Sequence, residues 1–232
     1  MQLYDAVYIY KSNGSDEELR YSLRSVEKNF PCKRVVICGS KPRGIAPDIQ
    51  MELAQFGATK WERARYTIER IAKNEDLTEK VWLFNDDFFI LEPVERFPAG
   101  WHNGSLPKAI HSLEERHNGP TRYSEEMTRT LRFLMERGMP RKNYAVHVPM
   151  LLERGKILET IRTFPVGGLF RSLYGNQHAL TGPNAPDVKI HSTSEKIPDG
   201  ATIISTSDRS FRDGEAGRQI RERFTERSKW EK

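Results

Sequence analysis

The sequence is poor in cysteine and contains no long apolar run. Only Cys32 and Cys38 occur in 232 residues, and two thiols in one short segment make neither a disulfide framework nor a thiolate zinc site. No stretch approaches the roughly 20 apolar residues of a membrane-spanning helix. The first ten residues also lack the basic and then apolar layout of a signal peptide. These absences predict reduced thiols, no membrane span and a cytoplasmic location.

The signature motifs of several enzyme classes are missing as well. There is no GxxxxGK(S/T) phosphate loop, no GxGxxG, no GxSxG and no HExxH, which disfavours P-loop NTPases, dinucleotide-binding dehydrogenases, α/β-hydrolases and zinc proteases. The net charge of +5 suits an anionic ligand, but the 37 basic residues are spread among 32 acidic ones. Such a dispersed excess fits the phosphate of a small ligand as well as it fits a nucleic acid.

What is present begins with an alternating strand and helix pattern. Residues 3–10 are typical of a β-strand, and residues 33–42 form a second apolar strand that ends at Gly and Pro. Between them lies a predicted helix with Ser15 and Glu18 as a capping box. This β-α-β order predicts two parallel strands and an α/β fold in which ligands bind beyond the carboxyl ends of the strands.

The remainder of the chain is less regular. A helix is expected from residue 60 to 77, and helices are also expected near 122–137 and 152–163. Gly and Pro recur through residues 93–120, which predicts loops around a site. A short strand and a charged helix complete the chain, and we expect a single domain over residues 1–232.

The stretch VWLFNDDFFILEP, residues 81–93, places Asn85, Asp86 and Asp87 in an otherwise apolar run. A buried, unpaired carboxylate is costly, so this pair should meet a cation, accept hydrogen bonds or lie where the strand enters a site. Paired carboxylates at a strand end suit a hard divalent cation beside a diphosphate. The alternative is that the pair only closes a turn. Strand alternation allows one aspartate to face a ligand while the other braces a loop.

Other polar residues are weaker candidates. Arg20 and Arg24 lie one helical turn apart and could clamp a phosphate, although pairing with neighbouring glutamates is the simpler interpretation. His147 lies between apolar residues before a proline, where an imidazole can act as a base, bind phosphate or serve only the structure. Further polar residues lie in sequence that we predict to be loop: Arg171, Tyr174, Asn176, Asp187 and Lys189.

Several segments match, in order, the sequence blocks of a known family. DAVYIYKSNGSD follows the pattern DxVYTWVxGxD, except that Tyr10 and Lys11 replace Trp and Val, and LRYSLRSVEKNFP repeats the block LRYSLRSVExxxP. VWLFNDDFFI matches FIYxNDDxFF, while HVPMLLERGKILETI and FRSLYGN resemble a third block. On these residues the chain resembles the Stealth family of sugar-phosphate transferases. Those enzymes make bacterial capsular polysaccharides and include the lysosomal-enzyme N-acetylglucosamine-1-phosphotransferase.

The resemblance implies a GT-A-like fold with a mixed, mostly parallel sheet flanked by helices. It implies a nucleotide-sugar donor, Mg²⁺ or Mn²⁺ as cofactor, and a carbohydrate or other hydroxyl acceptor. Residues 1–97 would form the donor-binding core, and residues 98–232 the acceptor-side and C-terminal elements. The implied metal ligands are Asp86 and Asp87. The implied catalytic residues are Asp87, His147 and Arg171. The implied donor-binding residues are Asp5, Arg20, Arg24, Asn85 and Asn176.

Two questions stay open at the level of sequence. Attack of the acceptor on the β-phosphorus would transfer a sugar phosphate, whereas attack on the anomeric carbon would transfer a sugar, and both use the same residue types. The chain also resembles compact actinobacterial and phage proteins labelled glycosyltransferase, so modified DNA is a conceivable acceptor. The competing class is a non-catalytic module that binds polysaccharide or nucleic acid.

Overall fold

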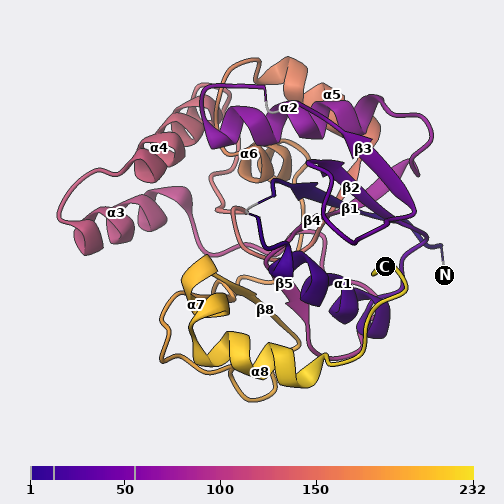
Figure 1. Cartoon of the computed structure of the whole chain (residues 1–232). Coiled ribbons are helices and arrows are strands. Elements are labelled where there is room, and N and C mark those ends of the chain that lie inside the picture. The colour runs from indigo at the N-terminus through magenta and orange to yellow at the C-terminus, as the bar shows by residue number, and fades with distance from the viewer. Residues whose placement is uncertain (1, 13, 55) are drawn as a thin grey trace.

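A five-stranded sheet forms the centre of the protein (Figure 1). The computed structural model describes residues 2–12, 14–54 and 56–232. The strand order is β3-β2-β1-β4-β6, in which the first four strands are parallel and β6 is antiparallel. The prediction of an α/β fold with a mixed, mostly parallel sheet is confirmed. The strands are β1 (Asp5–Tyr10), β2 (Val35–Gly39), β3 (Ile49–Glu52), β4 (Lys80–Asn85) and β6 (Met150–Glu153).

Helices cover both faces of this sheet. On one face, Leu19, Leu23 and Val26 of α1 (Glu17–Asn29) pack with alternate residues of β1, β2 and β4. The opposite face carries α2 (Lys60–Lys73), α5 (Arg154–Thr163) and α6 (Phe170–Gln177). Figure 1 shows α2 and α5 above the sheet and α1 below it. Burial of one large aliphatic side chain contributes about 2 kcal/mol, so these two faces provide most of the driving force for the fold.

A second, three-stranded sheet lies on the α1 side. It has the order β5-β8-β7 and packs against two C-terminal helices, where Phe89 and Ile204 meet Phe211 and Ile220. Figure 1 shows these helices along the lower edge of the molecule. The elements are β5 (Phe88–Ile90), β7 (Lys189–Ile190), β8 (Ile203–Thr206), α7 (Asp208–Arg212) and α8 (Glu215–Arg223).

A pair of helices extends from one side of the protein. They are α3 (Leu106–His117) and α4 (Arg122–Met135), and they share a small core around Leu106, Met127 and Leu134. Because residues 93–120 were predicted to be loop, α3 corrects that prediction. Pro107 stands in the first turn of α3, where proline is favoured, and Asn118 ends the helix in a left-handed conformation with φ of 54°.

Three further expectations about local structure are wrong. The apolar run of residues 81–93 does not form one strand: a turn at Asp86 and Asp87 divides it into β4 and β5, which enter different sheets. The capping box at Ser15 does not form, because α1 begins after Asp16 and the Glu18 carboxylate instead accepts a hydrogen bond from Thr206 at 3.1 Å. The segment that carries Arg171 and Asn176 is helix α6 rather than loop.

The expectations for the cysteines and for membrane spans can also be compared with the structure. Cys32 and Cys38 are free thiols. Throughout the part of the chain that the structure describes, no helix has the length and apolar character needed to cross a bilayer.

Candidate functional site

The turn at Asp86 and Asp87 lies at the carboxyl edge of the parallel strands. It directly follows β4, whose last residue, Asn85, pairs in register with Ile9 of β1. Ligands of open α/β sheets bind outside this edge. Two helices also begin near this turn. Glu18, in the first turn of α1, and Asp208, the first residue of α7, interact electrostatically with Asp86.

Four carboxylates gather around this turn: Glu18, Asp86, Asp87 and Asp208. Burial, reinforced by the charges of the other three, raises the pKa of Glu18 to about 8. Burial and the charges of Asp87 and Asp208 likewise raise the pKa of Asp86 to about 7. Ionisation of Glu18 and Asp86 is therefore opposed at neutral pH, and a bound cation would relieve the repulsion. We refer to these four residues as the acidic cluster.

The two aspartates of the turn have different partners. Asp87 Oδ2 accepts a hydrogen bond from Lys189 Nζ at 2.7 Å, and both side chains are largely buried. Its second oxygen, Oδ1, is buried and has no hydrogen-bond partner among the described residues. The carboxylate of Asp86 is hydrogen-bonded to its own backbone N–H. Asp87 is thus anchored to β7, whereas the neighbours of Asp86 are mainly other carboxylates.

His147 forms a close pair with Asp187 beside this turn. Asp187 Oδ2 lies 2.7 Å from Nδ1 of His147, and Oδ1 accepts the backbone N–H of the same residue at 2.9 Å. Burial opposes ionisation of Asp187, but its hydrogen bonds and charge interaction with His147 outweigh this effect and hold the pKa below the usual range. Asp187 is therefore an anion at neutral pH, and the contact is a charge-assisted one.

Arg171 lies in the first turn of α6 and donates to backbone carbonyls on both sides of His147. Its Nη1 contacts Val146 O at 3.2 Å and Val148 O at 2.5 Å. The guanidinium lies 5.5 Å from the centre of the Phe88 ring. Burial lowers the pKa of Arg171 to about 10 against the opposing effect of Asp87 and Asp187, so the group stays cationic at neutral pH.

The structure does not bring Asp5 to this site. Asp5 begins β1, so it lies at the amino edge of the sheet, at the opposite end from Asp86. Its carboxylate accepts hydrogen bonds from Arg34 at 2.7 and 3.0 Å and from the Thr78 N–H at 2.9 Å. These contacts join the beginnings of two strands, and the expectation that Asp5 binds the donor stays a prediction.

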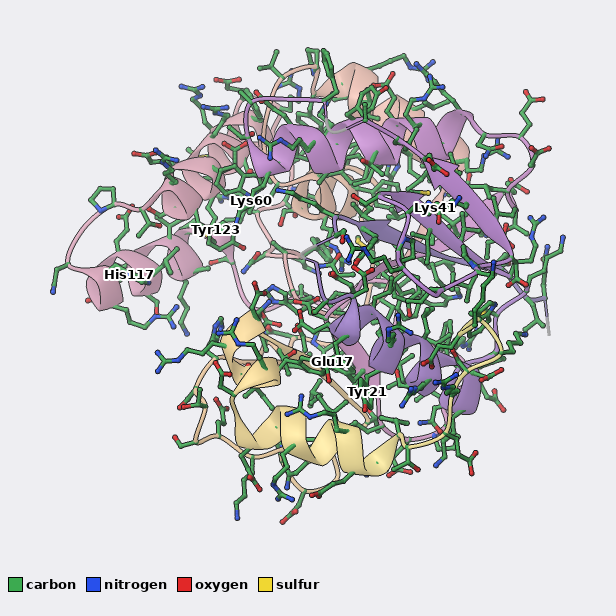
Figure 2. All side chains as sticks on the ribbon, in the orientation of Figure 1. Glu17, Tyr21, Lys41, Lys60, His117 and Tyr123 are labelled. Atoms are coloured by element: carbon green, nitrogen blue, oxygen red, sulfur yellow. The ribbon has the colours of Figure 1, made fainter. Side chains whose placement is uncertain are left out.

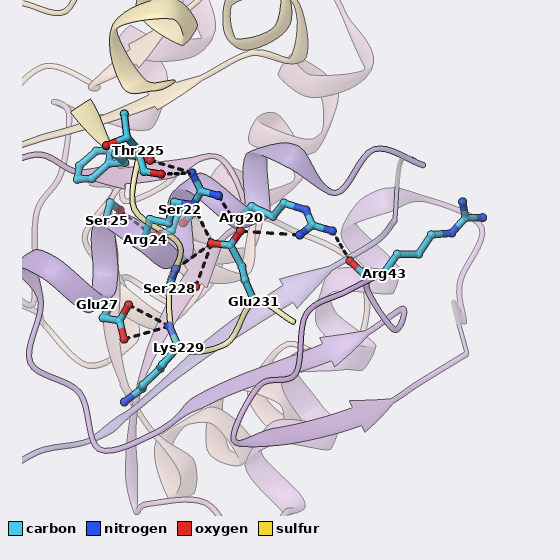
Figure 3. Close-up of polar contacts among 11 residues, drawn as sticks. Arg20, Ser22, Arg24, Ser25, Glu27, Arg43, Thr225, Ser228, Lys229 and Glu231 are labelled. Atoms are coloured by element: carbon cyan, nitrogen blue, oxygen red, sulfur yellow. Dashed lines mark hydrogen bonds and ion pairs between the residues drawn. The ribbon is translucent and has the colours of Figure 1, made fainter. Parts of the chain in front are cut away.

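Arg20 and Arg24 hold the C-terminal segment instead of facing a phosphate pocket (Figure 3). Arg24 donates two hydrogen bonds of 2.7 Å to Glu231 and one of 2.9 Å to Phe224 O. Arg20 donates to Arg43 O and lies 3.8 Å from Glu231. The donor groups of both arginines are thus engaged with the chain itself, and their assignment to the donor stays a prediction.

Asn176 is also engaged internally. Its amide donates to Lys142 O at 2.9 Å and to Ser172 O at 2.7 Å, and it accepts the Lys142 N–H at 2.9 Å. The side chain is almost completely buried. This set of bonds fixes the segment before His147 to α6, and the donor-binding assignment of Asn176 stays a prediction.

Several residues of the site were missed or misread in the sequence. Glu18 lies between two matching family blocks, and its spacing from Ser15 suggested a cap. Asp208 comes shortly after strand β8, just as Asp86 comes directly after strand β4. This similar position at a strand end was the feature of the sequence that could have identified Asp208. Tyr123 of α4, labelled in Figure 2, interacts electrostatically with Asp187 and Arg171 although it is distant in sequence.

A second polar contact fixes the rim of the site. The carboxylate of Asp16 accepts hydrogen bonds from the Tyr10 hydroxyl, from Ser12 Oγ at 2.8 Å and from the Arg43 N–H at 2.7 Å. These bonds join the loops that follow β1 and β2. Because both loops leave the carboxyl edge, Asp16 controls their spacing beside the acidic cluster.

Comparison with known proteins gives no assignment. No protein-family model matches the chain, and no curated protein matches it significantly. The resemblance to the Stealth family therefore stays a prediction.

Proposed function

We propose that the protein is a nucleotide-sugar-dependent transferase that moves a sugar or a sugar 1-phosphate from a UDP-sugar-type donor to a hydroxyl acceptor. One observation carries the proposal: at the carboxyl edge of the sheet, the acidic cluster lies together with the cations Lys189 and Arg171 and with the His147–Asp187 pair. Transfer to a hydroxyl requires a proton acceptor and neutralisation of the leaving phosphate. Such neighbouring groups supply both requirements.

The carboxylate oxygens of the acidic cluster are ligands of the kind that a hard divalent cation prefers. Carboxylate oxygens are the preferred ligands of Mg²⁺ and Mn²⁺, and Asp87 Oδ1 is buried without a partner among the described residues. No group of three Asp, Glu, His or Cys side chains in the described ranges is already arranged to hold a metal. A bound cation would neutralise charge on the donor diphosphate.

We assign different roles to the two aspartates of the turn. Asp86 is the metal-facing residue, because its carboxylate is repelled by its neighbours and has no cationic hydrogen-bond partner among the described side chains. Asp87 is the brace, because Lys189 already neutralises it at 2.7 Å. Because Lys189 occupies Oδ2, only Oδ1 of Asp87 is left to share a cation that Asp86 holds.

In the proposed transfer, each bond that forms is matched by a bond that breaks. The acceptor hydroxyl gives its proton to Nε2 of His147 while its oxygen bonds to the β-phosphorus or to the anomeric carbon of the donor. The bond from that atom to the departing nucleotide oxygen breaks, and its electron pair leaves with UMP or UDP respectively. Arg171 and Lys189 contribute positive charge near the departing phosphate.

The test is to incubate the purified protein with a panel of UDP-sugars, Mg²⁺ or Mn²⁺ and saccharide acceptors, and to identify the released nucleotide chromatographically. UMP indicates sugar-phosphate transfer, and UDP indicates glycosyl transfer. Mn²⁺ binding, followed by electron paramagnetic resonance, should weaken in Asp86→Asn and persist in Asp199→Asn, a change in an exposed loop.

A different result would refute the proposal. If no donor is turned over and none shifts the melting temperature, the transferase assignment fails. Salt-dependent binding of polysaccharide or DNA that Asp86→Asn leaves unchanged would instead identify a binding module.

A further inference from the structure

We propose that Asp187 is the positioning residue of His147: it fixes the imidazole as the Nδ1–H tautomer and leaves Nε2 to accept a proton from the acceptor hydroxyl. The inference rests on the proposed transferase function, since it names the residue that prepares the base of that reaction. Sequence reasoning placed Asp187 only among polar residues in a loop.

The argument begins with the chemistry of the contact. An ionised carboxylate has acceptor atoms only, so the 2.7 Å contact between Asp187 Oδ2 and Nδ1 of His147 requires that Nδ1 carries a proton. The neutral ring then has its lone pair on Nε2. Because Nε2 is the remaining ring nitrogen, it is the atom that can take up a proton.

A second contact fixes the orientation of the pair. The other oxygen of Asp187 accepts the backbone N–H of His147 at 2.9 Å, so one carboxylate binds both the backbone and the ring of one residue. A single hydrogen bond would leave the carboxylate free to rotate. Two bonds to two different groups of His147 define both its position and the direction of the ring.

The backbone of His147 is also held by α6. Arg171 donates to the carbonyls of Val146 and Val148, the two neighbours of His147, and both valine side chains are buried. The base is thus held through its flanking carbonyls and through its own N–H and ring. A residue that served packing alone would need no ring contact to a carboxylate brought from 40 positions away in the sequence.

The charged groups around the pair do not replace Asp187. Lys189, Arg171, His191 and Tyr123 interact electrostatically with this region, but Lys189 is hydrogen-bonded to Asp87. Burial, together with the charges of Lys189 and His147, holds the pKa of His191 below its usual value. Most of these neighbours are cationic when charged, and Asp187 is the carboxylate that directly contacts the His147 ring.

The decisive variant is Asp187→Asn, which preserves the shape of the side chain. Its oxygen can still accept the His147 N–H, but its NH₂ group would then face Nδ1 and favour the opposite tautomer. The matched control is Asp48→Asn. Asp48 also accepts a backbone N–H and a ring N–H, from Val35 at 2.7 Å and from Trp230 at 3.0 Å, at a place away from His147.

The tautomer can be measured without substrate. Nitrogen-15 NMR of histidine-labelled protein, with His147→Gln to assign the signal, should show Nδ1–H in the wild type and in Asp48→Asn, and Nε2–H in Asp187→Asn. In the transferase assay, kcat of Asp187→Asn should fall by about 10³-fold to 10⁴-fold with little change in KM, because binding contacts remain while the base is in the wrong tautomer.

Each contrary result has a distinct meaning. An unchanged His147 tautomer in Asp187→Asn overturns the inference, and so does an altered tautomer with normal kcat. A wild-type protein that neither turns over any donor nor is shifted in melting temperature by one refutes the transferase proposal and the catalytic role with it. The NMR comparison still decides in that case whether Asp187 sets the ring.

Discussion

The parallel sheet has a carboxylate with a shifted pKa at each end, and the two shifts are in opposite directions. At the amino edge, Asp5 is buried, yet Arg34 and Thr78 outweigh the effect of burial and hold the pKa of Asp5 below its usual value. At the carboxyl edge, burial and neighbouring carboxylates raise the pKa of Asp86 to about 7. The first arrangement stabilises the folded protein, whereas the second carries a cost at neutral pH that binding of a cation would relieve. The difference separates a structural carboxylate from a candidate functional one.

The strongest test of this contrast is to remove the charge of Asp86. Asp86→Asn should reduce transferase turnover by about 10²-fold or more, because the metal-facing carboxylate is lost. Its free energy of unfolding at pH 8 should be equal to or higher than that of the wild type, since the repulsion with Asp87 and Glu18 decreases. Steady-state kinetics and urea unfolding measure the two quantities. A variant that is less stable and fully active would make Asp86 structural.

The second test is the pH dependence of stability. The pKa of Asp86 and of Glu18 is higher in the folded protein than in the unfolded chain, so their stabilising contributions are complete below about pH 4 and disappear as the pH rises through about 7 and 8. We expect the free energy of unfolding to fall by at least about 2 kcal/mol between pH 5 and 8. Urea titrations at four pH values should show it.

The double variant Asp86→Asn with Glu18→Gln sharpens this measurement. In the double variant, the free energy of unfolding should fall less between pH 5 and 8 than in the wild type. Asp199→Asn, a change in an exposed loop, should leave the fall unchanged. The contribution of Asp5 to the free energy of unfolding depends on pH in the opposite direction. Because its pKa is lowered in the folded protein, this contribution is present above about pH 4 and is lost as the pH falls below that value. A wild-type curve that is flat from pH 5 to 8 would contradict the raised pKa values.

The third test removes the carboxylate at the amino edge. Asp5→Ala should destabilise the fold by about 2 kcal/mol, because it leaves Arg34 and the Thr78 N–H without their acceptor. The turnover of the folded fraction should stay normal. Chemical denaturation measures the change, and Asp199→Ala serves as the exposed control. A stable but inactive Asp5→Ala protein would restore Asp5 to the donor site.

The smallest expected effect concerns the arginines of α1. Arg24→Lys loses the bidentate contact with Glu231. It should lower the free energy of unfolding by about 1 kcal/mol and leave the transferase activity unchanged. Arg227→Lys, an exposed change in the same C-terminal region, should alter neither quantity. Thermal unfolding together with donor-binding measurements would distinguish the roles. Loss of donor affinity in Arg24→Lys at normal stability would revive the phosphate clamp.

Local signals predicted the outline of the fold well and the contacts of long side chains poorly. The β-α-β start follows from periodicity and turn residues, and the structure confirms its parallel pairing. Arg20 and Arg24 were expected to meet a phosphate or a neighbouring glutamate, yet they bind Glu231, about 200 positions later. The His147–Asp187 contact likewise joins residues 40 positions apart. Such pairs leave no periodic pattern in the sequence, because chain folding alone brings them together.

The sequence by itself determined the β-α-β start with its parallel strands, the helix that begins at residue 60 and the position of two adjacent carboxylates at the end of an apolar strand. Apolar periodicity and turn residues act over a few neighbouring positions, so these features can be read locally. Only the tertiary structure decided that Asp87 pairs with Lys189, that Glu18 joins the acidic cluster and that Asp187 holds His147. Burial and charge depend on which distant segments meet, and they separate the partnered carboxylate of Asp5 from the repelled carboxylate of Asp86.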